Sequence, residues 1–183
     1  LSFGYYDPYF TVDGIGVGFD AYNREIDATS MNIGNYKTRT VGAGGTIGIP
    51  LNDTDGIRFG VSPSHTTLTL NDSSPTSYKS FASTYGSSYA SAPVSAAWSR
   101  DTRDSALWTM RGYVRRVGSE VSAIGDLQYY KASIQQTSFM PLTADTTLSL
   151  NGEFAASHGL GSKPMPFFLN YYAGGVGSVR GYQ

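Results

Sequence analysis

The sequence contains no cysteine, which excludes a disulfide framework and a thiolate metal site. Charged residues are few, at 15% of the 183 residues, and the formal net charge is −1. A nearly neutral chain gives no electrostatic reason to expect a nucleic-acid partner. The only histidines, His65 and His158, fall at predicted strand or loop ends, which is a poor basis for a catalytic triad or a zinc pair. The composition therefore predicts a protein that is not an enzyme and needs no metal or other cofactor.

Long apolar runs are also missing, because no run approaches the roughly 20 residues that a membrane-spanning helix needs. Hydropathy does not detect membrane barrels, whose alternating strands each give a weak signal. The first four residues lack the charged start and apolar core of a signal peptide. Gln183 follows directly after a glycine-rich loop, so we interpret the chain as an internal piece of a longer protein.

Glycine and tyrosine are abundant, at 22 and 14 residues, and apolar residues alternate with glycine or polar residues along most of the chain. In residues 15–22, for example, Ile15, Val17 and Phe19 alternate with Gly16, Gly18 and Asp20. A period of two is typical of β-strands. The pattern recurs at 40–49, 57–62, 90–99, 113–123, 130–135 and 148–157. We therefore expect about seven complete strands and part of another, each long enough for the roughly 9–11 residues that cross a bilayer.

The connections between these strands differ in length. They are tight at 11–14, 50–56 and 140–146, and longer at 27–36, 71–88 and from 158 onward. Residues 71–88 are rich in Ser, Thr, Asp and Pro, which predicts a long surface loop. Beyond Pro63 the apolar positions change parity at Leu68 and Leu70, which predicts a register slip with a bulge or an edge. Short periplasmic turns and long extracellular loops are typical of outer-membrane barrels.

A soluble β-sandwich also alternates and remains an alternative on pattern alone. The polar face, however, is mostly Gly, Ser and Thr with a few charges, which suits a water-filled lumen. These charges are Arg116, Glu120, Lys131 and Glu153. Aromatic residues also gather near strand ends, as interfacial girdles do; they are Tyr5, Tyr6, Tyr9, Phe10, Tyr129, Tyr130 and Phe139. We predict an all-β protein, an antiparallel transmembrane β-barrel of the outer-membrane type, present as about half of the barrel.

Two short motifs have simpler explanations than ligand binding. Residues 52–56 hint at a calcium loop, but Leu51 occupies the position of the first ligand and the final Glu is missing. A polar hairpin turn explains them better. Residues 175–180 begin like a dinucleotide fingerprint but lack its third glycine.

The last stretch, residues 167–183, is aromatic at its start and glycine-rich in its middle, with one charge at Arg180. Its glycines permit backbone conformations that other residues resist, and its dense aromatics argue against disorder. We predict a folded loop organised around Arg180. The supporting residues are Tyr171, Tyr172, Gly174, Gly175 and Gly177.

Residues 170–175 and 178–182 resemble the sixth extracellular loop of the BamA family of outer-membrane barrel-assembly factors. The loop motif of that family, Val-Arg-Gly-Phe, corresponds here to Val179, Arg180, Gly181 and Tyr182. Residues 7–14, 126–131 and 163–168 are similar to an early turn, a later strand and the approach to that loop. One departure lies after Arg103 and Asp104, where residues 107–112 lack the family's Phe-Pro-Thr.

The resemblance implies one partial barrel domain over 1–183, with strand hairpins in 1–157 and a lumen-folding sixth extracellular loop in 158–183. It implies that Arg180 pairs with acidic residues on later strands, which this chain does not contain. The implied function is non-enzymatic: folding β-barrel proteins and inserting them into the bacterial outer membrane. The implied partners are outer-membrane lipids, unfolded β-barrel clients and accessory lipoproteins. The alternative within the same superfamily is a secretion barrel, either a two-partner secretion pore or an autotransporter-assembly relative.

Overall fold

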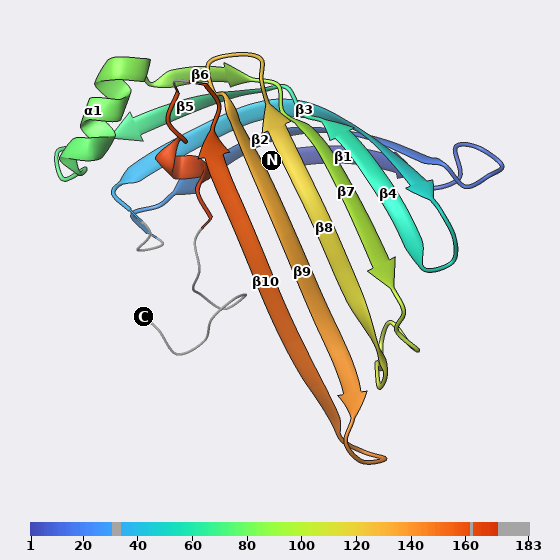
Figure 1. Ribbon diagram of the computed structural model, residues 1–183. Coiled ribbons are helices and arrows are strands. Elements are labelled where there is room, and N and C mark those ends of the chain that lie inside the picture. The colour runs from blue at the N-terminus through green and yellow to red at the C-terminus, as the bar shows by residue number, and fades with distance from the viewer. Residues whose placement is uncertain (31–33, 162, 172–183) are drawn as a thin grey trace.

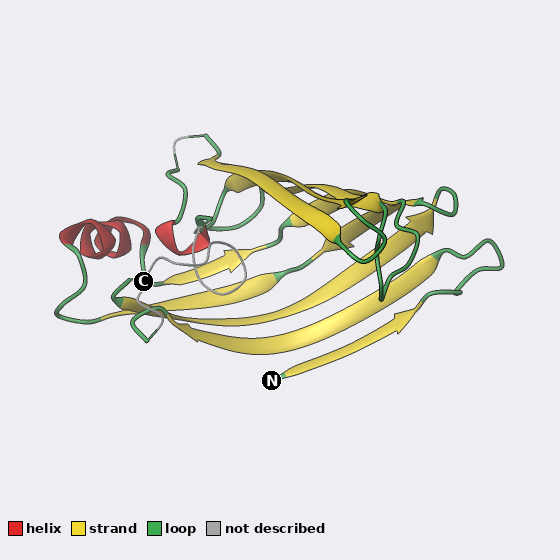
Figure 2. Ribbon diagram, turned by 90° about the horizontal axis from the view of Figure 1, so that it is seen from below, coloured by secondary structure: helices red, strands yellow, loops and turns green. Residues whose placement is uncertain are grey.

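The computed structural model describes residues 1–30, 34–161 and 163–171. They form one antiparallel, 10-stranded sheet that curves into an open trough (Figures 1 and 2). The strands are β1 (Ser2–Asp7), β2 (Gly16–Asp27), β3 (Tyr36–Pro50), β4 (Asp55–Val61), β5 (Ser64–Leu70), β6 (Ser88–Ser91), β7 (Val94–Asp101), β8 (Gly112–Ser122), β9 (Tyr129–Pro141) and β10 (Thr147–Gly159). Their order is β1-β2-β3-β4-β7-β8-β9-β10, and β5 pairs with β3 and β6. The predicted all-β fold is confirmed.

The strands β4 and β5 are two parts of one long strand along β3. Val61 pairs with Gly45 and Ser64 with Gly42, so each strand contributes two residues between these pairs and the register stays in step. The carbonyl of Pro63 still accepts the N–H of Ala43 at 3.1 Å. The predicted register slip is therefore wrong. With β6 and β7 joined in the same way, the described residues form seven long strands and the short β1, as expected.

Opposed residues in the sheet share a face, and the predicted parity is confirmed. Val17, Ile47 and Phe59 are aligned across β2, β3 and β4 on the convex face. Their neighbours Gly18, Thr46 and Gly60 are aligned on the concave face. Leu68 and Leu70, opposite Thr38 and Tyr36, lie on this concave face too, which is why their parity differs from that of β4.

Glycines on the concave face make room for Tyr6. A Cβ atom on Gly18 would lie 2.8 Å from the Tyr6 ring, and one on Gly48 would lie 2.8 Å from its hydroxyl oxygen. A side chain at Gly16 would meet the same ring. Tyr6 therefore points into the trough, and its prediction as a girdle residue is wrong. By pairing, Tyr129 and Phe139 share this inward direction, since they oppose Ser122 and Gly112 on the concave face.

The segment predicted as a long loop contains the helix α1 (Thr76–Tyr85). The helix begins after Pro75, whose carbonyl accepts the N–H of Tyr78 at 3.0 Å. It ends at Tyr85, and the following Gly86 has a positive φ of 86° and donates its N–H to the carbonyl of Ala82. The loop prediction is wrong here because Ser and Thr dominate the segment. The helical signal is the spacing of Tyr78, Phe81, Ala82 and Tyr85, at i, i+3, i+4 and i+7.

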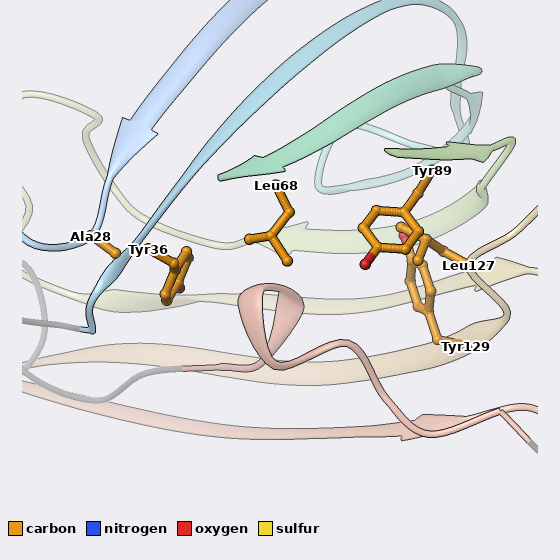
Figure 3. Close-up of a cluster of buried hydrophobic side chains, with 6 residues drawn as sticks. All are labelled: Ala28, Tyr36, Leu68, Tyr89, Leu127 and Tyr129. Atoms are coloured by element: carbon orange, nitrogen blue, oxygen red, sulfur yellow. The ribbon is translucent and has the colours of Figure 1, made fainter. Parts of the chain in front are cut away.

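The two ends of the trough differ. At the turn end, where β1, β3, β7 and β9 finish, the connections are 8–15, 51–54, 102–111 and 142–146. At the loop end, where β2, β5, β8 and β10 finish, lie α1 and the 3-10 helix η1 (Phe167–Leu169) (Figure 1). The buried hydrophobic cluster also lies at the loop end, on the concave side (Figure 3). It consists of Ala28, Tyr36, Leu68, Tyr89, Leu127 and Tyr129.

Candidate functional site

Of the predicted loop residues, Tyr171 lies within the described part of the chain. It is 44% exposed. The other predicted residues lie outside the described residues, so the arrangement around Arg180 stays a prediction. They are Tyr172, Gly174, Gly175, Gly177, Val179, Arg180, Gly181 and Tyr182. What the structure shows is the base from which this stretch departs.

That base is η1, which lies inside the trough against α1 and the sheet (Figure 2). The Phe167 ring stacks on Tyr78 of α1, with centroids 3.9 Å apart and planes at 4°. It also meets the edge of Tyr36 on β3 at 5.1 Å. The Phe168 ring lies 5.7 Å from Tyr89 of β6. Residues of three other elements, α1, β3 and β6, therefore hold the approach to the predicted loop.

The chain between β10 and η1 is held against the connection that follows β8. The N–H of Leu160 donates to the carbonyl of Gln128 at 2.9 Å, and Lys163 Nζ donates to the carbonyl of Asp126 at 3.0 Å. Gly159 permits the chain to fold back closely on itself, since a Cβ atom there would lie 2.8 Å from the backbone nitrogen of Met165. The segment thus turns back into the trough immediately after β10.

A charged pair on the concave face contacts the start of the predicted loop. Glu120 and Lys131 are opposed across β8 and β9. Tyr129 donates its hydroxyl to Glu120 Oε1 at 2.8 Å. Lys131 Nζ lies 5.5 Å from the ring centroids of both Tyr129 and Tyr171, which is within cation–π range. Tyr171 is therefore held by a cation that the opposed carboxylate balances.

The four charges predicted for the lumen do share the concave face. Arg116 and Glu153 both oppose Gln135, from β8 and β10 respectively, and Glu120 opposes Lys131. Tyr129 is buried beside them, which its sequence position did not predict. Its position near a strand end fits either face, and only the pairing with Ser122 places it inside.

The described residues contain no group of three or more His, Cys, Asp or Glu side chains placed to hold a metal ion. His65 Nε2 lies 2.8 Å from Ser88 Oγ, and by parity this pair is on the convex face. His158 lies beside the ring of Tyr130, with centroids 6.0 Å apart. Among the described helices, none has the length and apolar character to cross a membrane.

The proposed calcium-like motif is a hairpin turn, as predicted. Asn52 Oδ1 accepts the N–H groups of Thr54 and Asp55, both at 2.9 Å. The Asp55 carboxylate is engaged by Arg100, through Nε at 2.8 Å and Nη2 at 2.9 Å. Its oxygens therefore accept hydrogen bonds from Thr54 in the turn and from Arg100 on the neighbouring strand.

Charges on the convex face lie near the two ends of the trough. At the loop end Lys37 Nζ bridges Asp27 at 2.7 Å, and Glu25 opposes Arg39. At the turn end lie Asp55, Arg100 and Arg115. The exposed side chains between them are apolar, as on a lipid-facing wall; they include Phe19, Val41, Ile47, Phe59, Val94, Val117, Ile134 and Phe154.

Comparison with known proteins agrees with this arrangement. Residues 1–183 match the Omp85 superfamily domain. The chain belongs to the Omp85 superfamily. It is 39% identical over 194 aligned positions to the outer membrane protein assembly factor BamA of Neisseria meningitidis serogroup B, covering 100% of this chain and 24% of that protein. The chain therefore spans about a quarter of the length of this curated relative.

A solved structure shows the same fold. This Omp85 chain superimposes on BamA from Haemophilus ducreyi lacking POTRA domains 1–3 with a TM-score of 0.85 and 23% identity. The match covers 99% of this chain and 37% of that one. The recognition of the family from its loop motif and the prediction of a barrel wall are confirmed, and the chain is part of an outer-membrane protein.

Proposed function

We propose that this Omp85 chain is the barrel part of an assembly factor that folds other β-barrel proteins and inserts them into the outer membrane. The observation that carries the proposal is the 39% identity to BamA along the whole chain. The convex face with its apolar middle and the polar concave face are consistent with a wall between lipid and lumen. The activity belongs to the complete protein, of which this chain is one section.

The proposed mechanism needs no catalytic group. An unfolded client strand pairs through its backbone N–H and C=O groups with an open sheet edge, in the manner of β-augmentation. In the family that edge is the seam between the first and last barrel strands. This chain supplies part of the wall and the base of the proposed lumen loop. Accessory lipoproteins and outer-membrane lipids are the other partners that we propose.

The function is tested with the full-length protein and its accessory lipoproteins in lipid vesicles. A urea-unfolded client barrel is added, and insertion is read from the faster gel migration of the unheated folded barrel and from its protease resistance. We expect insertion that vesicles without the protein do not show. A protein that instead exports a soluble passenger, and inserts no barrel, would be the secretion relative.

For the loop itself we propose that Arg180 is bound in the lumen by carboxylates of later strands. A buried arginine must be paired, and its planar fork suits a carboxylate in a way that lysine cannot reproduce. The contacts of Phe167, Phe168 and Tyr171 support this proposal, because they place the residues just before the loop motif inside the trough.

We expect Arg180→Ala in the full-length protein to leave those carboxylates unpaired. The loop then becomes more accessible to protease on intact cells, and client insertion falls while the strand content is kept. Arg180→Lys restores part of the protection, and Tyr182→Phe behaves as wild type because the ring is retained. Wild-type protection and insertion in Arg180→Ala would contradict the proposed role.

A further inference from the structure

Two arginines face each other on the convex surface at the turn end. Arg100 of β7 and Arg115 of β8 are directly opposed. Asp55 neutralises Arg100, whereas the Nε of Arg115 donates to the neutral amide oxygen of Gln136 at 2.8 Å. The three charged groups therefore sum to one positive charge. Like charges directly opposed across a sheet are destabilising, and an anion bound here would offset this.

The guanidinium of Arg115 is available to a ligand. Arg115 takes part in none of the ion pairs found among the described residues. The hydrogen bond that its guanidinium donates within this part of the chain uses Nε. Its Cζ lies 5.5 Å from the centroid of the Tyr113 ring, and Arg100 Cζ lies 5.7 Å from that of Trp98. Each guanidinium group therefore lies beside an aromatic ring. The N–H groups on the free edge of a guanidinium match the oxygens of a phosphate.

An apolar hollow lies next to the arginine pair, toward the loop end. Its floor is a row of small residues aligned across three strands, Ala96, Ser119 and Ala132. The adjacent row is large, with Trp98, Val117, Ile134 and Phe154 aligned in the same way. The step between the two rows leaves a hollow of about 560 Å³, within the usual size range of small-molecule sites.

The spacing fits one phospholipid. Arg115 and Ser119 lie four residues apart on β8, which is about 13 Å along a strand. That distance is comparable with one leaflet, or half of the roughly 30 Å hydrocarbon core. A phosphate at Arg115 therefore places an acyl chain over the row of small residues. The three strands that form the floor of the hollow, β7, β8 and β9, are paired on both sides, so their backbone offers no edge to a protein strand.

We propose that this surface is a binding site for an anionic phospholipid, with the phosphate at Arg115 and one acyl chain in the hollow. The net positive charge favours a headgroup without its own cation over a zwitterionic one. Trp98 and Tyr113 flank the phosphate position, as interfacial aromatic residues do at the headgroup level. The site depends on the membrane location of the convex face and is independent of client insertion.

The test uses the full-length protein in detergent micelles that contain equal phosphatidylglycerol and phosphatidylethanolamine with the same acyl chains. Native mass spectrometry then counts the lipids retained on the protein. We expect wild type to retain phosphatidylglycerol preferentially. Arg115→Gln lowers its retention about tenfold, which corresponds to about 1.4 kcal/mol. Ala132→Phe fills the hollow and lowers the retention of both lipids.

Two further variants make the result specific. Gln136→Glu keeps Arg115 but pairs it with a carboxylate, so it abolishes the preference even if Arg115→Gln does not fold. Arg39→Gln is the control, because Arg39 is a convex-face arginine at the loop end, bonded to Asn23 at 3.2 Å. It should leave the retention of both lipids unchanged.

Equal retention of the two lipids by wild type would overturn the proposal. So would a preference that persists in both Arg115→Gln and Gln136→Glu. Displacement of the lipid by inorganic phosphate alone, with no effect of Ala132→Phe, would mean a phosphate site without an acyl subsite and would also contradict it. A copurifying protein retained at this face in place of lipid would contradict it equally.

Discussion

At the residue scale, the sheet is built on alternation, with glycine used where an inward side chain needs space. Gly16, Gly18 and Gly48 lie under the Tyr6 ring, whereas Gly152 on the convex face has nothing within 4 Å of its absent Cβ. The sequence shows all four simply as glycines at alternating positions. Their different roles follow from a tyrosine on a neighbouring strand, which sequence pattern does not locate.

We therefore expect Gly16→Ala to destabilise the barrel by about 1–3 kcal/mol, because the added methyl displaces Tyr6 from a filled site. The matched substitution Gly152→Ala should be neutral or slightly stabilising, since it enters open space. Urea unfolding of the folded full-length protein in vesicles measures both. Equal costs at the two glycines would mean that Tyr6 does not lie over Gly16.

Whether a residue lies on the convex or the concave face predicts how much an introduced charge destabilises the barrel. Arginine at Ile47, Val17 or Leu150 on the convex face should cost roughly 2–4 kcal/mol near the bilayer midplane. The control is Thr46→Arg, one residue away on the concave face. Gly16 is unsuitable as this control, because Tyr6 covers it. The free energy of unfolding measures the difference, and equal small costs on both faces would show that the parity is wrong.

At the element scale, the strands were predictable and the covering elements were not. A period of two identifies a strand such as β2 from its own residues. The position of η1 depends on contacts of Phe167 with Tyr36 and Tyr78 and of Phe168 with Tyr89. These three tyrosines are far from η1 in sequence. Leu68 was predicted to follow a register slip, because its even position does not match the odd, convex-face positions of β4. It is buried, at 3% exposure, in the cluster that η1 and α1 cover.

The turn after β7 is held by hydrogen bonds to the side chain of Asp104. Its carboxylate accepts the N–H groups of Arg111 at 3.2 Å and Met110 at 3.0 Å. These bonds, that of Arg111 first, hold the pKa of Asp104 below its ordinary value of 3.8. A depressed pKa stabilises the turn fully above that ordinary value, and the contribution is lost as the pH falls through the folded pKa.

We expect pepsin to cut the turn at residues 102–111 at a constant low rate near pH 5, and faster as the pH falls below about 3.8. The variant Asp104→Asn corrects for the pH dependence of pepsin itself. It should be cut more readily near pH 5 and show no additional step below. A wild-type profile parallel to that of the variant would show that the carboxylate does not hold the turn.

At the scale of the whole molecule, the chain is a curved sheet with an apolar convex face and a polar concave face. The sequence predicted two faces from alternation, and the strand pairing confirms that the apolar and the polar residues lie on opposite faces of the sheet. The arrangement around Arg180 stays a prediction, because residues 172–183 lie outside the described residues. The central claim is that the convex face of the sheet contacts the acyl chains of the membrane.

That claim is tested most directly by placing single cysteines at four successive positions of β9 in the full-length protein, with any other cysteines removed. The positions are Ala132, Ser133, Ile134 and Gln135. Each cysteine carries a polarity-sensitive fluorophore, and lipids with a quencher in the acyl chain are added. The account predicts strong quenching at 132 and 134 and weak quenching at 133 and 135. Equal quenching at all four positions, or the opposite alternation, would contradict it.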